Sequence, residues 1–211
     1  MKARLVDALL RVCADKENDS FVIEDIIRAA DVSRGTFYKY YNSLDELMLE
    51  AGEQLADQIT QENIAIAEKV DDPISRTSIG LINIFTSAVE NRYWGNFVSR
   101  MLMSDSDEIF IKNFASDEYL RGRECGDYNF ENIDAVVDVT FGAIALVLRA
   151  IAKGETRPAY IAEASVQILL SLGALRPAAV RAVEHAMTHA PRRGGAPEGR
   201  KATIGVLAGL E

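Results

Sequence analysis

Apolar residues recur at helical spacing along most of the chain, and this periodicity constrains the fold more than any other feature. Residues 2–16, for example, place Leu5, Leu9, Val12 and Cys13 on one face of a helix. No segment between turn-forming residues alternates polar and apolar side chains, which would indicate a strand. We therefore predict an all-α protein.

Turn-forming residues divide this pattern into successive helices. We expect helices over residues 2–16, 23–30, 34–41, 44–69, 73–91, 94–103, 107–124, 131–153, 158–173 and 177–189. All five prolines follow residue 72, and Pro73 stands where a first helical turn accepts proline. The predicted organisation is a helix-turn-helix domain (1–45), a larger helical domain (46–190) and a mobile tail (191–211).

The chain has 211 residues, of which 48% are hydrophobic, so it can bury a sizeable core. Its formal net charge of −9 argues against nucleic acid as a partner, but the charge is unevenly distributed. Residues 1–44 contain seven Lys or Arg and seven Asp or Glu, and residues 32–44 contain no acid. The sequence therefore predicts one local surface that could approach phosphate.

Two short helices, 23–30 and 34–41, are joined by a tight turn in the proportions of a helix-turn-helix. Ser33 is a suitable N-cap for the second helix, and Phe37 and Tyr41 can share its inward face. In that motif the second helix enters the major groove with its N-terminus first. From spacing alone, an ordinary core-anchored helix pair with solvated charges is the favoured alternative, because small helix pairs are common.

The side chains on the outward face have the chemistry for reading DNA. Arg34 can bind guanine through two hydrogen bonds, and the methyl group of Thr36 can contact thymine. Gly35 leaves room for a sugar or a base edge, and the hydroxyls of Tyr38 and Tyr40 suit phosphate oxygens.

The stretch EDIIRAADVSRGTFYKYYNSLDELMLEAGEQ, residues 24–54, resembles the DNA-binding domain of the TetR family of transcriptional regulators. The similarity covers about residues 2–55, and the rest of the chain fits the family only in the order of its helices and in its length. The resemblance implies DNA contacts by Ser33, Arg34, Gly35, Thr36, Tyr38, Lys39 and Tyr40.

The chain departs from the family pattern at three positions. Leu44 stands where the family usually has a phosphate-binding Lys, Asp31 replaces the usual glycine of the turn, and Val22 replaces a capping Thr or Ser. Only Lys2 and Arg4 precede or begin the first helix as a possible backbone-contacting arm. We expect the loss of a phosphate contact to weaken the sequence-independent part of the affinity.

The helices at 131–153 and 158–173 are apolar on more than one side, so each is expected to be buried on more than one side. We predict a homodimer in which both helices pack against a second copy, as the resemblance also implies; a buried helix pair in a monomer is the alternative. The predicted interface comprises Ile133, Val137, Thr140, Ile144, Val147, Ile151, Ile161, Ser165, Ile168 and Leu172.

The middle of the chain is rich in aromatic and methionine side chains, which either fill the core or line a cavity. The family resemblance implies an effector site there, and its apolar character favours a small hydrophobic or aromatic molecule. The candidate effector-binding residues are Trp94, Phe97, Met101, Phe110, Phe114 and Phe141.

Other candidate chemistry is weak. His185 and His189 lie one helical turn apart but have no evident third ligand, so we expect no metal, no cofactor and no catalytic set.

The longest apolar run, 139–148, is too short for a membrane span, and the two cysteines, Cys13 and Cys125, do not form a disulfide framework. A cytoplasmic location without membrane association follows.

These observations together predict a homodimeric, ligand-responsive transcriptional regulator that binds operator DNA, more readily a repressor than an activator. The alternative is a helical ligand-binding or protein-interaction module whose DNA-binding domain has weakened. Leu44, the short arm and the zero net charge of residues 1–44 favour that alternative.

Overall fold

The computed structural model describes residues 1–15, 21–52, 54, 70–103 and 110–189, and every regular element among them is a helix. The predicted all-α class is therefore confirmed. The helices are α1 (Lys2–Asp15), α2 (Ile23–Ala30), α3 (Arg34–Tyr38), a helix that begins at residue 44, α5 (Pro73–Glu90), α6 (Arg92–Leu102), α7 (Phe110–Glu124), α8 (Ile133–Ala152), α9 (Pro158–Ser171) and α10 (Arg176–His189). The predicted helix beyond residue 54 and the predicted tail at 191–211 lie outside the described residues.

Local capping explains several of the boundaries. The carboxylate of Asp72 accepts a 2.7 Å hydrogen bond from the backbone N–H of Ser75, with Pro73 in the first turn of α5. Asn132 caps α8 in the same way, by accepting from the N–H of Ala135 at 3.0 Å. Side-chain oxygens thus satisfy amides that the helix itself leaves unpaired.

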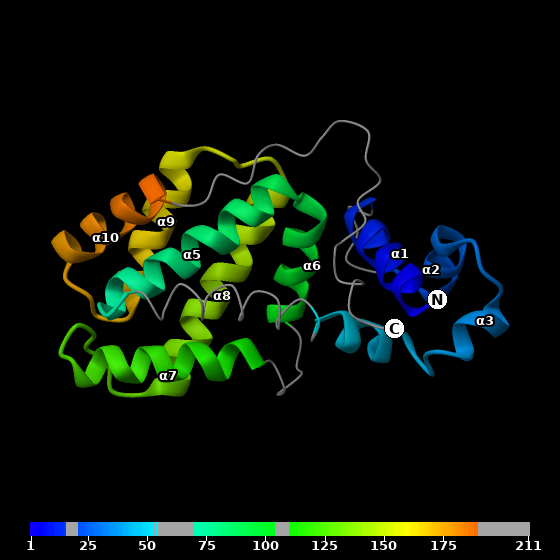
Figure 1. The fold of residues 1–211 in the computed structure, drawn as a ribbon, viewed down its shortest axis with the longest axis horizontal. Helices are drawn as coiled ribbons and strands as arrows, with labels where there is room; N and C mark the ends of the chain where they lie inside the picture. Colours follow the sequence, from blue (N-terminus) through cyan, green and yellow to red (C-terminus); the bar gives the residue numbers. More distant parts are fainter. Residues whose placement is uncertain (16–20, 53, 55–69, 104–109, 190–211) are drawn as a thin grey trace.

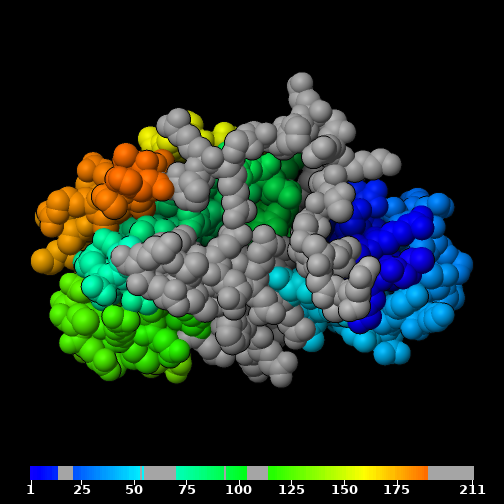
Figure 2. Space-filling model, in the orientation of Figure 1, coloured from blue at the N-terminus to red at the C-terminus, as the bar shows by residue number. Residues whose placement is uncertain are grey.

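The N-terminal helices lie at one end of the molecule and α10 lies at the other (Figures 1 and 2). In the N-terminal domain, α1 packs against α2, and α2 packs against α3. The fully buried side chains of this core include Leu5, Leu9, Ile26, Phe37 and Leu47.

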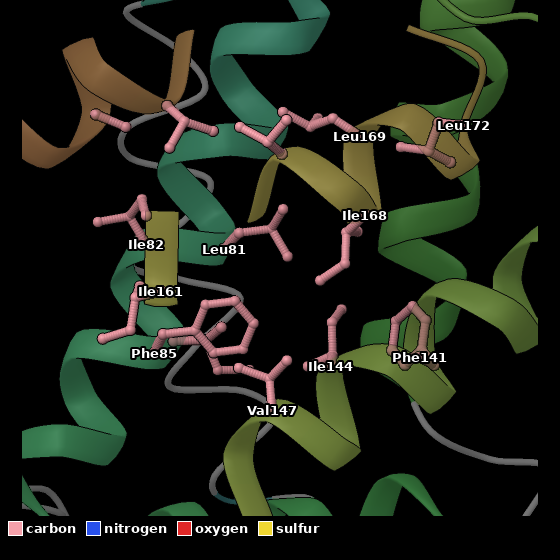
Figure 3. Close-up of a cluster of buried hydrophobic side chains, with 14 of the residues drawn as sticks. Leu81, Ile82, Phe85, Phe141, Ile144, Val147, Ile161, Ile168, Leu169 and Leu172 are labelled. Atoms are coloured by element: carbon pink, nitrogen blue, oxygen red, sulfur yellow. The ribbon is translucent and has the colours of Figure 1, made fainter. Parts of the chain in front are cut away.

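The larger domain is built around α8, which packs against α5, α6, α7 and α9. Figure 3 shows Ile144 and Val147 of α8 facing the same interior as Leu81 and Phe85 of α5 and Ile168 of α9. By length and composition α8 could cross a membrane, yet half of that apolar stretch is buried inside the protein. Its hydrophobicity is accounted for by its central place in the core.

The helix α6 joins the two domains because its two faces belong to different cores. Phe97 is fully buried in the N-terminal core, whereas Val98 and Leu102 belong to the core around α8. The buried hydroxyl of Ser99 donates a 2.8 Å hydrogen bond to the carbonyl of Ala145 in α8. On the other side, the amide of Asn96 donates to the carbonyl of Cys13 at 2.6 Å.

The turn after α9 depends on a glycine. Gly173 has φ +85°, and a Cβ there would lie 2.7 Å from the backbone nitrogen of Asn129 and closer still to its carbonyl oxygen. The same loop is held by a 2.9 Å hydrogen bond from the N–H of Asn129 to the carbonyl of Leu172. Gly126 also has a positive φ, +81°, but a Cβ there would meet nothing within 4 Å.

We expect Gly173→Ala to lower the free energy of unfolding by several kcal/mol, roughly 2–4, because backbone strain and steric overlap add together. Gly126→Ala is the matched control, and we expect it to cost only the left-handed backbone strain, about 1 kcal/mol. Urea unfolding followed by circular dichroism measures both. Equal losses in the two variants would show that the contact with Asn129 imposes no constraint.

Candidate nucleic-acid interface

The reversal between α2 and α3 is produced by a left-handed residue. Asp31 has φ 50° and ψ 56°, and its N–H donates to the carbonyl of Arg28 at 3.2 Å. The N–H of Val32 reaches back to the carbonyl of Ile27 at 3.1 Å. Asp is one of the few non-glycine residues that adopt this conformation, so the missing turn glycine does not abolish the motif.

The start of α3 has the predicted cap. The hydroxyl of Ser33 accepts from the N–H of Thr36 at 3.0 Å, and the two hydroxyls of these residues are 2.8 Å apart. By contrast, Val22 provides no side-chain cap for α2, although its own N–H donates to the carboxylate of Asp25 at 3.0 Å.

Two buried aromatic side chains orient the recognition segment. Phe37 is fully buried and Tyr41 is 1% exposed, with their ring centroids 6.1 Å apart. The helix α3 ends at Tyr38, earlier than predicted, and Lys39 and Tyr40 follow in a turn. The predicted inward pair is thus confirmed, and between its members Tyr38 and Lys39 are exposed, whereas Tyr40 packs partly against the core.

The structure places the predicted DNA-binding residues together on one surface. Ser33, Arg34, Gly35, Tyr38 and Lys39 are exposed, and Thr36 and Tyr40 are partly exposed. A Cβ on Gly35 would have its only near neighbour at 3.9 Å, so this stretch of backbone is open to a ligand. A surface of this kind is accessible to a DNA groove.

The charges on this surface are partly neutralised by neighbouring carboxylates. The guanidinium of Arg34 lies 3.1 Å from the carboxylate of Glu24 and 5.8 Å from the ring centroid of Tyr38. Hydrogen bonding to Tyr38 and the negative charge of Glu24 both raise the pKa of Arg34. Lys39 instead lies over the ring of Tyr40, at 5.9 Å. Glu24 was not among the predicted site residues, because its spacing from Arg34 in the sequence carries no signal of contact.

The predicted N-terminal arm is occupied by contacts within the protein. Lys2 forms a 2.6 Å ion pair with Glu50, and Arg4 donates to the carbonyl of Asp31 at 3.1 Å. Leu44 is partly buried against the N-terminal core, in the place where the family pattern has a lysine.

The candidate effector residues are divided between the two cores. Phe97 is fully buried in the N-terminal core and Met101 packs against that core, where a Cβ on Gly52 would overlap the Met101 side chain. Trp94 contacts both cores, whereas Phe141 belongs to the core around α8. Phe114 is partly exposed, and the side chain of Phe110 lies outside the described part. Phe97 and Met101 therefore serve the joint between the domains.

The predicted dimer seam needs correction, because its side chains point into the protomer. All of the ten residues except the partly buried Ile133 are buried within a single chain; they are Val137, Thr140, Ile144, Val147, Ile151, Ile161, Ser165, Ile168 and Leu172. Figure 3 shows several of them packed with α5. Because α8 is apolar on nearly all sides, the spacing of its apolar residues does not show which face is turned away from the core of the protomer.

The opposite face of α8 is open and carries two large apolar side chains, with the exposed charges of Asp138 and Arg149 beside them. Val139 is 58% exposed and Leu146 is 63% exposed, and a Cβ on Gly142 between them would meet nothing within 4 Å.

Among the described residues, no group of three or more His, Cys, Asp or Glu side chains is placed to hold a metal ion. His185 and His189 stack on each other at 4.1 Å near the end of α10.

Comparison with known proteins identifies the N-terminal domain. Residues 5–51 match the family described as bacterial regulatory proteins, tetR family. No curated protein matches the chain.

Solved structures share the fold over most of the chain. RolR in complex with its ligand resorcinol has a TM-score of 0.64 and 23% identity, over 92% of this chain and 94% of that chain. The fatty acid degradation regulator FadR from Bacillus halodurans has a TM-score of 0.63 and 16% identity, over 83% of this chain and 100% of that chain. A TetR family transcription regulator from Marinobacter aquaeolei VT8 has a TM-score of 0.60 and 17% identity, over 84% and 94% respectively.

We expect Ser33→Ala to lower the free energy of unfolding by about 1 kcal/mol, because the N–H of Thr36 loses its acceptor at the start of α3. Ser33→Thr retains a hydroxyl and should recover most of the loss. Thermal and urea unfolding of the three proteins provide the measurement. A Ser33→Ala variant as stable as the wild type would rule out a capping role for this hydroxyl.

Proposed function

We propose that the chain is a ligand-responsive transcriptional repressor, because residues 5–51 match the tetR family of bacterial regulatory proteins and the fold is similar to solved structures that include a TetR family transcription regulator. In this proposal it acts in the cytoplasm as a homodimer and leaves its operator when a small hydrophobic or aromatic effector binds. The observation that carries the proposal is the exposed outward face of residues 33–40, held by the buried anchors Phe37 and Tyr41.

Base reading is assigned to Arg34, Thr36 and Lys39, and phosphate contacts to Ser33, Tyr38 and Tyr40. Arg34 lies at the N-terminus of α3, the end that enters the major groove in a helix-turn-helix. Its guanidinium fits the two acceptors of guanine, whereas hydroxyl groups fit phosphate oxygens.

We expect Arg34→Ala to weaken operator binding by about 1–3 kcal/mol and to relax the preference at one base position. Tyr38→Phe should instead weaken all duplexes about equally, because phosphate contacts carry no sequence information. Fluorescence anisotropy on an operator duplex and a scrambled duplex separates the two effects. If Arg34→Ala leaves both affinities unchanged in a folded protein, Arg34 has no part in reading DNA.

Dimerisation is proposed to use the open face of α8 rather than the inward seam. The exposed side chains of Val139 and Leu146 flank the open position Gly142, which would allow two helices to approach closely. A dimer is useful for reading DNA because it sets two recognition helices about 34–36 Å apart on one side of the duplex.

We expect Leu146→Glu to give a folded monomer at micromolar concentration, since it places a charge in the proposed interface while leaving the core intact. Ile144→Glu should unfold the protein, because Ile144 is 6% exposed and a charge there would be buried without a partner. Val89→Glu, on an exposed position of α5, is the matched control and should remain dimeric.

Sedimentation velocity together with circular dichroism distinguishes these outcomes. A dimeric Leu146→Glu protein would place the interface elsewhere. A wild-type protein that sediments only as a 23.2 kDa species would exclude the dimer altogether.

Effector control is proposed to act through α6. This helix contributes Phe97 to the N-terminal core and is joined to α8 through the Ser99–Ala145 hydrogen bond, so a displacement of α6 changes the position of α1. An effector that binds better to the displaced arrangement lowers operator affinity by its differential affinity for the two states. RolR with resorcinol supports a small aromatic effector as the first class to test.

A second candidate function is a ligand-binding or protein-interaction module with a weakened DNA-binding domain. The ion pairs of Lys2 and Arg34, together with Leu44, favour it, because each reduces attraction to phosphate. Salt-dependent binding to a DNA duplex from the region upstream of this protein's own gene supports the first function, and the absence of such binding supports the second.

A further inference from the structure

Carboxylates neutralise nearly all of the basic side chains that the structure describes in residues 1–44. The pairs are Lys2–Glu50 at 2.6 Å, Arg4–Asp31 at 3.5 Å, Arg11–Asp7 at 3.0 Å, Arg28–Asp25 at 3.9 Å and Arg34–Glu24 at 3.1 Å. Within this described set, Lys39 alone has an aromatic ring instead of a carboxylate as its neighbour. A DNA-facing domain with so little uncompensated charge cannot derive much affinity from phosphates.

The Arg34–Glu24 pair differs from the others because it lies on the reading surface itself. Glu24 is in the first turn of α2 and Arg34 is the first residue of α3, so the pair bridges the two helices of the motif. Both side chains are well exposed, at 67% for Arg34 and 51% for Glu24. Either group is therefore open to a DNA ligand.

The pair engages one nitrogen of the guanidinium. Glu24 Oε1 contacts Arg34 Nη1, and an arginine has five N–H donors arranged as a fork. Tyr38 uses a further donor, and the donors that Glu24 and Tyr38 leave unused can bond to O6 and N7 of guanine. The charge that Arg34 presents to a phosphate is nevertheless largely cancelled by Glu24.

We propose that Glu24 is a specificity-determining residue of this DNA-binding surface: it orients Arg34 for guanine and suppresses attachment of Arg34 to phosphate. The inference rests on the proposed DNA-binding function and adds an acidic residue to a surface otherwise assigned to basic and hydroxyl groups. Glu24 lowers the affinity for random DNA more than the affinity for the operator, and so raises the ratio between them.

The test compares Glu24→Gln with a matched control, Asp7→Asn, in the full-length protein. Both substitutions remove one negative charge from an exposed ion pair, but the Asp7–Arg11 pair lies within α1 and not on α3. The probes are a duplex enriched by the wild-type protein from a random-sequence pool and a scrambled duplex of the same composition. Fluorescence anisotropy over a salt series gives affinities and salt slopes, and circular dichroism confirms the fold.

We expect Glu24→Gln to tighten binding to the scrambled duplex by about two- to fivefold, the range for an exposed ion pair. The slope of log affinity against log salt should steepen by about 0.9, equivalent to one more phosphate contact. Affinity for the enriched duplex should change less, so that the ratio of the two affinities falls. Asp7→Asn should leave that ratio unchanged.

Combination with Arg34→Ala separates an effect through Arg34 from simple repulsion of phosphate. In the Arg34→Ala background, Glu24→Gln should no longer alter the ratio of affinities, because the partner it restrains is absent. An undiminished effect there would overturn the inference, as would a Glu24→Gln variant that behaves like Asp7→Asn in the wild-type background.

Different results would overturn the DNA-binding function and the role of Glu24. A wild-type protein that enriches no sequence and binds neither duplex overturns the DNA-binding function together with this inference. A wild-type protein that is sequence-specific, paired with a Glu24→Gln variant of equal specificity, overturns only the role of Glu24.

Discussion

The N-terminal domain does not close its hydrophobic core with its own helices, and much of the structure depends on this. Phe97, which belongs to α6, is fully buried among the side chains of α1 and the helices that follow it. A unit of about fifty residues buries too little apolar surface to be comfortably stable alone, so a large side chain from outside is a substantial contribution. The recognition helix is consequently built on a core that includes part of the other domain.

This shared core connects the larger domain physically to α3 and the exposed residues around it. The helix α6 is in contact with α1 on one side and with α8 on the other, and a hydrogen bond is present at each contact, partly buried towards α1 and buried towards α8. Packed cores respond to displacement by shifting between discrete arrangements rather than by deforming smoothly. A change in the packing of α6 against α8 therefore has a direct consequence for the position of α1, and through α1 and α2 for α3.

The ion pairs of the N-terminal domain affect its electrostatic field more than its stability. Five described ion pairs stabilise the arrangement of α1, α2 and α3 only modestly, because exposed pairs contribute little. Their larger effect is on the electrostatic field, which they reduce near the reading surface. In the proposed DNA-binding function, such a surface favours recognition by shape and by directed hydrogen bonds over attraction to phosphate.

Local features were predictable from the sequence because their causes are local. The Ser33 cap, the inward pair Phe37 and Tyr41, and the first-turn Pro73 all follow from spacing and residue chemistry within one or two helical turns. Helical periodicity along the chain predicted the all-α class, and these local features predicted how the segment 33–41 is anchored.

Only the tertiary structure decided against which helix or core each apolar face packs. Periodicity identified α8 as buried on several sides but could not distinguish Ile144, which faces the core, from Leu146, which is 63% exposed. It likewise could not assign Phe97 to the N-terminal core or bring Glu24 to Arg34. The reason is that hydrophobic spacing reports how much of a helix is buried, whereas the identity of the neighbour depends on contacts between residues far apart in the chain.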